Sequence, residues 1–233
     1  MSYINESVIY NIYPLGWCGA PKQNDGQLVY RLDKIYDWIP HLKKMSINCI
    51  VFNPLFESSF HGYDTIDYKK VDCRLGDNES FKKICKTLHE NGIKIILDGV
   101  FNHVGRDFFA FKDVQQNLQN SQYCGWFQNL GFWGSSPKGD PFTFAERMPK
   151  LNTSEKKVRD YFLDTVRYWI ETFDIDGLRL DAADVIDIEF FKKLRNTCKS
   201  KKPDFWLYGE LTHGDYNHWA NSETLDSATN YEC

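Results

Sequence analysis

Short apolar runs alternate along this chain with longer stretches in which apolar residues recur every three or four positions. Runs of about four to eight apolar residues that end at polar or turn-forming residues are typical of buried strands, whereas the longer spacing is typical of helices with one buried face. Six such runs are visible, at residues 8–13, 48–53, 93–98, 178–181, 205–210 and, more weakly, 226–231. We therefore expect six strands separated by helices.

Helices are expected between the strands, at residues 38–45, 81–88, 158–173 and 190–194. Apolar residues spaced by three and four positions fall on one face of each helix. Asn152 and Thr153 precede the long third helix, and their side chains are suitable N-caps for it. Pro40 fits the first helix best if it lies in the first turn, where its missing N–H group has no helical partner to lose.

Strands that alternate with helices favour a parallel sheet built from right-handed strand–helix–strand units. Two α/β architectures have this pattern, an open doubly wound sheet and a closed barrel of eight strands. A dinucleotide-binding sheet needs a Gly-x-Gly-x-x-Gly turn after its first strand. Residues 14–17 (PLGW) follow the first predicted strand and lack that pattern, so dinucleotide binding is not supported.

Composition narrows the class of protein further. Of the 233 residues, 42% are hydrophobic and the net charge is only −4, which excludes a disordered chain. Lysine and arginine (28) are outnumbered by aspartate and glutamate (32), so we expect no nucleic-acid or membrane partner. No apolar run approaches the roughly 18–20 residues of a membrane span, and residues 1–11 show no secretory signal.

Seven cysteines lie scattered along the chain without a Cys-x-x-Cys pair, which argues against a zinc or thiol-redox site. Cys49 and Cys85 lie within apolar patterns, and we interpret them as reduced core residues. These features are typical of a cytoplasmic protein. Aromatic residues make up 16% of the chain, and their flat apolar faces suit a sugar-binding surface as well as a core.

Three of the predicted strands end at an acidic residue, namely Asp98, Asp181 and Glu210. In a strand–helix barrel the carboxyl ends of all strands meet at one face, where catalytic groups gather, so these side chains would converge. Arg179 lies two residues before Asp181 and shares its strand face; a cation there would keep the carboxylate ionised, as a nucleophile requires. Adjacent strands lie about 4.8 Å apart, so neighbouring carboxyl groups can reach the separation of about 5–5.5 Å that is typical of retaining glycosidases.

Five segments combine these residues with further polar side chains. In chain order they are residues 61–68 (HGYDTIDY), 98–103 (DGVFNH), 148–152 (MPKLN), 177–184 (GLRLDAAD) and 209–211 (GEL). Together they resemble the alpha-amylase family, glycoside hydrolase family 13, and residues 148–152 resemble a signature of its neopullulanase, cyclomaltodextrinase and maltogenic amylase group. The similarity extends from about Val8 to the C-terminus and implies a (β/α)8 TIM barrel.

The resemblance implies a chemical role for several residues of these segments. Asp181 would be the nucleophile that forms a covalent glycosyl-enzyme, and Glu210 the general acid/base that protonates the leaving oxygen and then activates water. Arg179 would orient Asp181. His103 would bind a hydroxyl group of the sugar at the cleaved bond, and Tyr63 would stack beneath that sugar ring.

The same resemblance implies which residues support the site and whether a calcium site is expected. Asp98 and Asn102 would support the floor of the site. Family members with a calcium site usually carry Lys-His three and four residues after the nucleophile, whereas this chain has Asp184 and Val185 there. Asn102 alone would make a poor calcium site, because calcium takes about 6–8 oxygen ligands. We therefore expect neither an obligatory metal nor another cofactor.

The spacing of the strand ends predicts the domain organisation. The long interval between residues 98 and 181 leaves room for a small inserted subdomain after the third strand, at residues 104–151. A complete barrel typically has about 250 residues before insertions, so residues 1–233 are expected to form an incomplete TIM barrel of about six of the eight strand–helix units. The family's third carboxylate, which follows the seventh strand, is not expected within this chain.

These inferences predict a retaining glycosidase that hydrolyses α-1,4-glucosidic bonds of maltodextrins, starch oligosaccharides or cyclodextrins, with an oligosaccharide as its partner. One alternative is a non-catalytic carbohydrate-binding homologue or an inactive fragment; Asp181 and Glu210 are both present, which argues against loss by substitution. Another alternative is a transglycosylase or sucrose-type glucosidase of the same family. The sequence pattern does not predict the oligomeric state.

Overall fold

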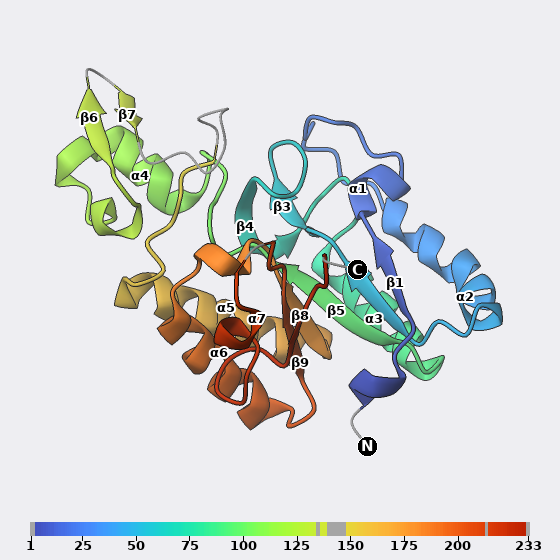
Figure 1. The fold of residues 1–233 in the computed structure, drawn as a ribbon. Helices are drawn as coiled ribbons and strands as arrows, with labels where there is room; N and C mark the ends of the chain where they lie inside the picture. The colour runs from blue at the N-terminus through green and yellow to red at the C-terminus, as the bar shows by residue number, and fades with distance from the viewer. Residues whose placement is uncertain (1–2, 134–135, 139–147, 213, 232–233) are drawn as a thin grey trace.

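A parallel sheet of six strands, curled into a half-barrel, forms the centre of the computed structural model, which describes residues 3–133, 136–138, 148–212 and 214–231 (Figure 1). Neighbouring strands are parallel throughout. In spatial order the strands are β1 (Ile9–Ile12), β2 (Cys49–Phe52), β5 (Lys94–Gly99), β8 (Gly177–Leu180), β9 (Trp206–Gly209) and β10 (Ser227–Ala228). Five predicted strands match to within one residue at each end, and the weak sixth is shortened to two residues.

Four longer helices cover the convex face of the sheet (Figure 1). They are α2 (Ile35–Lys44), α3 (Asn78–Glu90), α5 (Lys156–Phe173) and α6 (Ile188–Lys201). Their apolar faces and the outward-pointing strand residues form one continuous core. A doubly wound sheet has helices on both faces, whereas these helices lie on one; the prediction of an incomplete (β/α)8 barrel is confirmed.

The remaining elements are short. They are the α-helical turns α1 (Pro14–Trp17) and α7 (Tyr216–Trp219), and the 3-10 turns η1 (Tyr3–Glu6), η2 (Arg31–Lys34), η3 (Leu118–Asn120), η4 (Cys124–Trp126) and η5 (Ala183–Val185). None of the helices in the described part of the chain is long and apolar enough to cross a membrane.

Two local predictions about helix ends are wrong. Helix α5 begins at Lys156, and its N-cap is Glu155, whose carboxylate accepts a hydrogen bond from the Lys157 amide (3.2 Å). Thr153 instead accepts a hydrogen bond from the Asp187 amide, ahead of α6 (3.0 Å). A long-range contact therefore uses the side chain that the local pattern assigned to capping.

Pro40 lies in the interior of α2 rather than in its first turn. The helix begins at Ile35, directly after η2, so Pro40 is its sixth residue. A proline there leaves the carbonyl group four residues earlier without a helical donor. Pro40 is exposed, so water can satisfy that carbonyl group at the solvent side of the helix.

The concave face of the sheet carries a smaller apolar layer. Val51, Ile96, Gly177 and Trp206 are paired in register across β2, β5, β8 and β9. Gly177 makes room for this layer, because a Cβ atom there would lie 2.6 Å from the Trp206 carbonyl oxygen and 3.1 Å from the Ile96 side chain. Cys49 belongs to the same layer and is fully buried with a free thiol, as predicted.

An antiparallel hairpin, β3 (Phe56–Ser58) and β4 (Thr65–Val71), follows β2 and is not anticipated by the apolar pattern. Tyr68 anchors it, because its hydroxyl group donates to the carbonyl oxygens of Val100 (2.6 Å) and His103 (3.2 Å). The Trp169 indole of α5 in turn donates to the Tyr68 carbonyl oxygen (2.7 Å). The loop between β3 and β4 is therefore held over the carboxyl end of the sheet.

The predicted subdomain at residues 104–151 lies to one side of the sheet, beyond the end of α5 (Figure 1). It contains α4 (Phe109–Asn117) and a small antiparallel pair, β6 (Gly131–Trp133) and β7 (Ser136–Lys138). Residues 134–135 and 139–147 of the prediction lie outside the described residues. Its boundaries as a separate domain stay a prediction.

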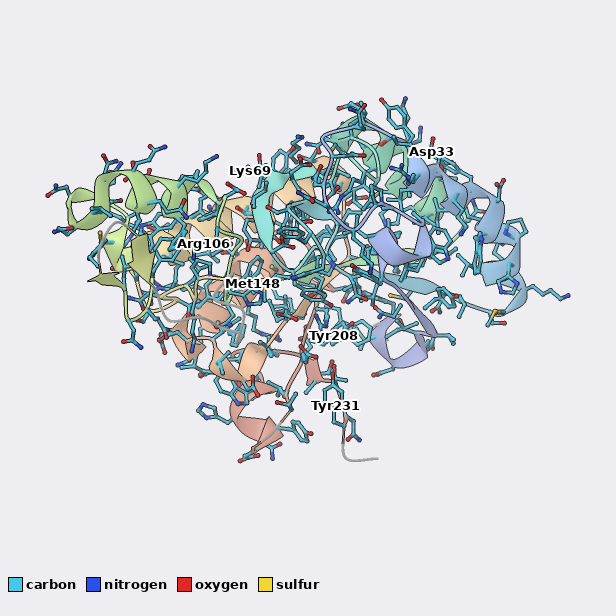
Figure 2. The ribbon with its side chains drawn as sticks, turned by 90° about the horizontal axis from the view of Figure 1, so that it is seen from above. Asp33, Lys69, Arg106, Met148, Tyr208 and Tyr231 are labelled. Atoms are coloured by element: carbon cyan, nitrogen blue, oxygen red, sulfur yellow. The ribbon has the colours of Figure 1, made fainter. Side chains whose placement is uncertain are left out.

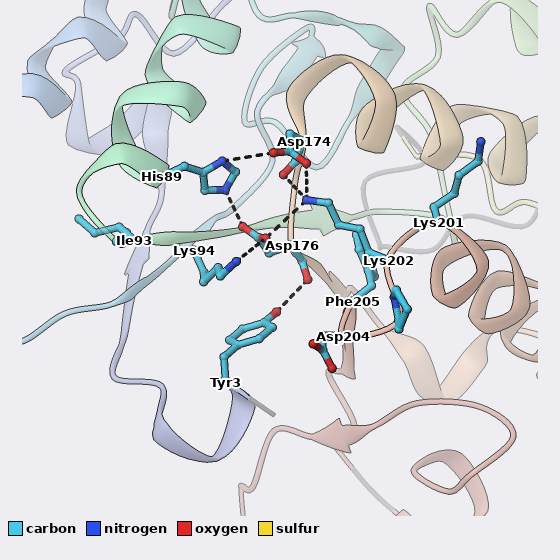
Figure 3. Close-up of a pocket in the computed structure, with 12 residues that line it drawn as sticks. Tyr3, His89, Ile93, Lys94, Asp174, Asp176, Lys201, Lys202, Asp204 and Phe205 are labelled. Atoms are coloured by element: carbon cyan, nitrogen blue, oxygen red, sulfur yellow. Dashed lines mark hydrogen bonds and ion pairs between the residues drawn. The ribbon is translucent and has the colours of Figure 1, made fainter. Parts of the chain in front are cut away.

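An ion-pair cluster closes the opposite, amino-terminal end of β5 and β8 (Figure 3). The buried carboxylate of Asp176 lies 2.7 Å from Nε2 of His89 and 3.1 Å from Nζ of Lys94, and it accepts a hydrogen bond from the Ile95 amide. The Tyr3 hydroxyl group donates to the Asp176 carbonyl oxygen (2.8 Å). This cluster joins η1, the end of α3 and two strands.

Candidate active site

The strand register places the predicted site residues in two adjacent rows across the carboxyl end of the sheet, one at the last strand residues and one just beyond them. Asp98 of β5 is paired with Arg179 of β8, and Arg179 is paired with Tyr208 of β9. Asp181 and Glu210 are the first residues after β8 and β9. The view down this end has Met148 on one side of Tyr208 and Tyr231 on the other (Figure 2).

A single guanidinium group joins the three carboxylates. Nη1 of Arg179 lies 2.8 and 2.7 Å from the two oxygens of Asp98 and 3.0 Å from Oδ1 of Asp181. Nη2 lies 2.7 Å from Oε2 of Glu210. The convergence of these four side chains, predicted from the strand ends, is therefore present in the structure.

The pKa values of the three carboxyl groups are shifted in different directions. Burial raises the pKa of Asp181 to about 7, and the nearby charge of Asp98 adds to this effect, although Arg179 opposes it. Burial also raises the pKa of Asp98 despite its two contacts with Arg179. Burial acts in the same direction on Glu210, but Arg179, the Ala182 amide and the Tyr231 hydroxyl group outweigh it, so the pKa of Glu210 is lowered.

Arg179 lowers the pKa of Asp181, the direction expected of a cation beside a carboxylate, but other effects act against it. One positive charge faces three carboxylates within about one hydrogen-bond length, so ionising all three leaves a buried excess of negative charge. Keeping one proton relieves this excess, and burial together with the charge of Asp98 raises the pKa of Asp181 to about 7. Burial and the neighbouring anion outweigh the adjacent cation.

Tyr231 is a contact of Glu210 that the sequence argument missed. Its hydroxyl group donates to Oε1 of Glu210 (2.9 Å), while the Ala182 amide donates to Oε2 (3.3 Å). Both carboxylate oxygens of Glu210 therefore have donors in the absence of substrate. Tyr231 lies after the last strand, and no local pattern marks it as a partner of Glu210.

Asn11 and Asn53 form a second chain of contacts beside Asp98, and neither was predicted as a site residue. The side-chain nitrogen Nδ2 of Asn53 donates to Asp98 (3.0 Å) and to the Tyr63 hydroxyl oxygen (3.2 Å). The side-chain oxygen Oδ1 of Asn53 accepts a hydrogen bond from the side chain of Asn11 (2.8 Å). Asn11 lies in β1 and Asn53 directly follows β2. Their place at the carboxyl end of the sheet, shared with the acidic residues that end other strands, is the signal that could have found them.

Tyr63 reaches this site from the loop between β3 and β4. Burial and the negative charge of Asp98 raise the pKa of its hydroxyl group, so Tyr63 stays neutral. The sequence analysis placed Tyr63 at the site only through the family resemblance. In the structure, the β3–β4 hairpin positions Tyr63 beside Asn53 and Asp98.

His103 and Asn102 are almost completely buried just beyond β5. Burial lowers the pKa of His103 to about 4, although a hydrogen bond with the Tyr63 backbone opposes this, so the ring is neutral near pH 7. The backbones of His103 and Lys150 form a β-bridge, and the Leu151 amide donates to the Asn102 carbonyl oxygen (2.8 Å). The segments 98–103 and 148–152 therefore lie side by side.

A family model described as the catalytic domain of alpha amylase matches residues 12–233. The chain belongs to the alpha-amylase family. The cyclomaltodextrinase of Thermoanaerobacter pseudethanolicus is 39% identical over 249 residues, which cover 98% of this chain and 43% of that protein. The maltogenic alpha-amylase of Bacillus acidopullulyticus is 36% identical, with 98% of this chain and 42% of that protein covered.

Solved structures agree with this assignment. The ligand-free cyclic alpha-maltosyl-(1→6)-maltose hydrolase of Arthrobacter globiformis superimposes with a TM-score of 0.86 at 30% identity. The match covers 99% of this chain and 56% of that one. The chain thus spans about half the length of these alpha-amylase relatives, which are named as glycosidases, and the predicted similarity to their group is confirmed.

One further acidic cluster in this alpha-amylase domain has the composition of a metal site. Ligand atoms of Glu57, Asp72 and Cys73 lie within 4.8 Å of one another. Glu57 already accepts from Lys70 (3.2 Å) and the Cys73 amide (2.9 Å), and Asp72 forms a two-point ion pair with Arg74 (2.8 and 2.6 Å). These donors occupy the oxygens that a cation needs, so the cluster does not fit a metal ion.

Asp184 also has a partner of its own, because the Thr212 hydroxyl group donates to it (3.0 Å). The Asn102 side-chain oxygen has no hydrogen-bond partner among the described residues, but one amide oxygen falls well short of a calcium coordination shell. The absence of an obligatory metal therefore stays a prediction for this chain.

Proposed function

We propose that the protein is a retaining glycoside hydrolase that cleaves α-1,4-glucosidic bonds in maltooligosaccharides or cyclodextrins. The observation that carries this proposal is the convergence of Asp98, Asp181 and Glu210 on the Arg179 guanidinium at the carboxyl ends of three neighbouring strands. Membership of the alpha-amylase family supports the reaction class. The relatives named cyclomaltodextrinase and maltogenic alpha-amylase support the substrate class.

Asp181 and Glu210 divide the reaction between them. In the first step an ionised Asp181 oxygen bonds to the anomeric carbon as the glycosidic C–O bond breaks, and Glu210 gives its proton to the leaving oxygen. In the second step Glu210 takes a proton from water, the water oxygen bonds to the anomeric carbon, and the Asp181 carboxylate is released. Two inversions at that carbon retain its α configuration.

The first step requires an ionised Asp181 and a protonated Glu210, which is the reverse of the pKa order in the free site. The reactive form has the same number of protons, with the proton on Glu210 instead. A sugar oxygen that displaces the Tyr231 hydroxyl group from Glu210 favours this form, because that hydroxyl group lowers the pKa of Glu210. Substrate binding and proton placement are thereby coupled.

The surrounding residues hold the sugar and the charges in place. Asp98 anchors Arg179, which then faces Asp181 and Glu210 from a fixed position. Tyr63, fixed by Asn53, supplies an aromatic face for the sugar at the cleaved bond. His103 is neutral near pH 7 and so can donate a hydrogen bond to a sugar hydroxyl group from a buried position.

The test is hydrolysis of maltotriose and β-cyclodextrin by protein expressed from the complete reading frame. Asp181→Asn and Glu210→Gln should each lower kcat by about 10⁴-fold or more. The matched controls are Asp164→Asn and Glu171→Gln, exposed on α5, which should retain activity. Proton NMR of the first products should show the α anomer; release of the β anomer, or unchanged activity in both site variants, would refute the proposal.

The same assay separates the alternatives. A carbohydrate-binding protein without catalysis would bind maltotriose and leave it intact. A transglycosylase would form products longer than the starting oligosaccharide, and a sucrose-type glucosidase would prefer sucrose to maltotriose. Each of these outcomes would replace hydrolysis of maltodextrins as the main activity.

A further inference from the structure

A fully buried arginine, Arg74, is the third residue after β4 and lies outside the group of carboxylates described above. Arginine is almost never fully buried unless it is paired. Arg74 is paired with Asp72, which accepts hydrogen bonds from Nε (2.8 Å) and Nη2 (2.6 Å). Burial lowers the pKa of Arg74, but the hydrogen bonds and the charge of Asp72 outweigh this effect, so the pKa is raised. The guanidinium group is therefore a fixed positive charge in the interior.

The ion pair uses only part of the guanidinium group. Nη2 of Arg74 also donates to the Ser58 hydroxyl oxygen (2.8 Å) at the end of β3. Nη1 donates to the Phe60 carbonyl oxygen (2.7 Å) and to the carbonyl oxygens of Pro21 (3.0 Å) and Lys22 (3.2 Å). The planar fork of arginine holds several acceptors at once. This one side chain therefore joins the segment after α1 and the β3–β4 loop to the end of β4.

Phe60 begins the turn that carries Tyr63, three residues later. The Asp64 carboxylate accepts hydrogen bonds from the amides of Phe60 (2.8 Å) and His61 (2.9 Å). These bonds lie within the turn, so they fix its shape but not its position relative to the sheet. The bond from Arg74 to the Phe60 carbonyl group reaches the turn from the end of β4 and does fix its position.

Tyr13 and Arg74 both hold the backbone of this turn from outside it. The Tyr13 hydroxyl group donates to the His61 carbonyl oxygen (3.0 Å), but Tyr13 is 41% exposed, so water competes for this bond. The bond to the Phe60 carbonyl group comes from a fully buried cation. A hydrogen bond from a charged donor is roughly twice as strong as a neutral one. Arg74 therefore provides the stronger attachment of the turn.

We propose that Arg74 is a positioning residue for the reaction, because it places the turn at residues 60–64 so that the Tyr63 ring lies beneath the sugar at the cleaved bond. Since Arg74 is fully buried, it does not reach the sugar and acts through Tyr63. The placement has to be accurate, because the Tyr63 hydroxyl oxygen also accepts a hydrogen bond from Asn53 (3.2 Å) while the ring faces the sugar. This inference rests on the proposed function, which gives Tyr63 its sugar.

The test is a double-mutant cycle of Arg74→Lys and Tyr63→Ala in protein expressed from the complete reading frame. Arg74→Lys keeps a positive charge beside Asp72 but loses the planar fork, so it cannot hold Ser58 and Phe60 together. It should lower kcat/KM for maltotriose about tenfold when Tyr63 is present and by less than about twofold in the Tyr63→Ala background. Equal losses in the two backgrounds would overturn the inference, because a purely structural arginine acts whether or not Tyr63 is present.

The matched control is Arg159→Lys on the outer helix α5. Arg159 donates to the Ser154 carbonyl oxygen (2.8 Å) and lies 3.9 Å from the Asp187 carboxylate. This variant should leave kcat/KM unchanged in both backgrounds. Should circular dichroism show that Arg74→Lys does not fold, Arg74→Gln combined with Asp72→Asn removes both buried charges together and replaces it in the cycle.

Calorimetric titration of maltotriose into the Asp181→Asn variant separates this inference from the proposed function, because binding needs no turnover. Adding Arg74→Lys should weaken binding about tenfold when Tyr63 is present and leave it unchanged in the Tyr63→Ala background. That pattern supports the role of Arg74 even if the unaltered protein hydrolyses nothing. Equal affinity with and without Arg74→Lys in the presence of Tyr63, or the same loss in both backgrounds, refutes it.

Discussion

Asp98 and Arg179 face each other on neighbouring strands, in paired register between β5 and β8, and Nη1 of Arg179 lies 2.8 and 2.7 Å from the two carboxylate oxygens of Asp98. Asp98 is buried, so water does not replace this contact. The same guanidinium group reaches Asp181 and Glu210. Asp98 therefore fixes the cation from which the two proposed catalytic carboxylates are positioned.

Asp98→Asn should impair activity, because an amide in place of the carboxylate cannot accept both hydrogen bonds from Arg179. We expect kcat to fall about 100-fold through misplacement of the cation. Maltotriose hydrolysis measures this effect. Asp164→Asn, on the exposed face of α5, is the control; an equal kcat of the two variants would contradict the anchoring role.

The pH dependence of kcat/KM should follow the single proton of the Asp181–Glu210 pair. The raised pKa of Asp181, about 7, marks the pH above which the pair loses that proton. Above it Glu210 cannot act as an acid, so we expect kcat/KM to fall as the pH rises through about 7. Activity that stays level between about pH 6 and pH 9 would contradict this protonation order.

Tyr231→Phe should change the acid limb of the same profile. The variant keeps the ring but removes the hydroxyl group that donates to Glu210 and lowers its pKa. The pKa of Glu210 should then rise, and the acid limb of kcat/KM should move to higher pH by about 0.5–1 pH unit. Tyr36→Phe, on the outer helix α2, serves as the control, and an acid limb unchanged by Tyr231→Phe would show that the hydroxyl group does not influence Glu210.

Asp176→Asn should destabilise the fold from the opposite end of the sheet. Burial alone would raise the pKa of Asp176, but the hydrogen bonds from His89 and Ile95 and the charge of Lys202 lower it to about 2. This carboxylate therefore contributes stability above its unfolded pKa of about 3.9, and that contribution is lost as the pH falls through about 2.

We expect Asp176→Asn to lower the free energy of unfolding by about 3 kcal/mol at pH 7. The difference from the unaltered protein should shrink towards pH 2, where Asp176 itself becomes protonated. Urea titrations at both pH values measure this. The control is Asp204→Asn, because Asp204 is exposed and lines the cavity beside this ion-pair cluster. A difference independent of pH would assign the loss to packing instead of charge.

Much of the scaffold was predictable because its signals are local. Apolar runs and helical spacing reflect which face of each element is buried, and this repeats within a few residues. The polar residues that end those runs lie at one edge of a parallel sheet, so the meeting of Asp98, Asp181 and Glu210 followed from the order of strands alone. The hairpin β3–β4 was not predicted, because apolar and polar residues do not alternate regularly in its two strands and the strands pair with a shifted register.

Other features depend on residues far apart in sequence. Thr153 binds the Asp187 amide instead of capping α5, and Asn53 links Asp98 to Tyr63 across the hairpin. Such contacts have no local pattern, since each side chain can make several hydrogen bonds and the fold selects among them.

By itself the sequence determined which residues lie at the carboxyl ends of the strands and which faces of the strands and helices are buried, because a regular backbone converts spacing directly into direction. Only the tertiary structure decided the direction in which the pKa of Asp181 is shifted. A cation next to Asp181 in the sequence suggested an ionised carboxylate, but Asp98 and Glu210 share that cation in a buried site. Burial and the neighbouring negative charge together raise the pKa of Asp181, and both arise only when three strands are brought together.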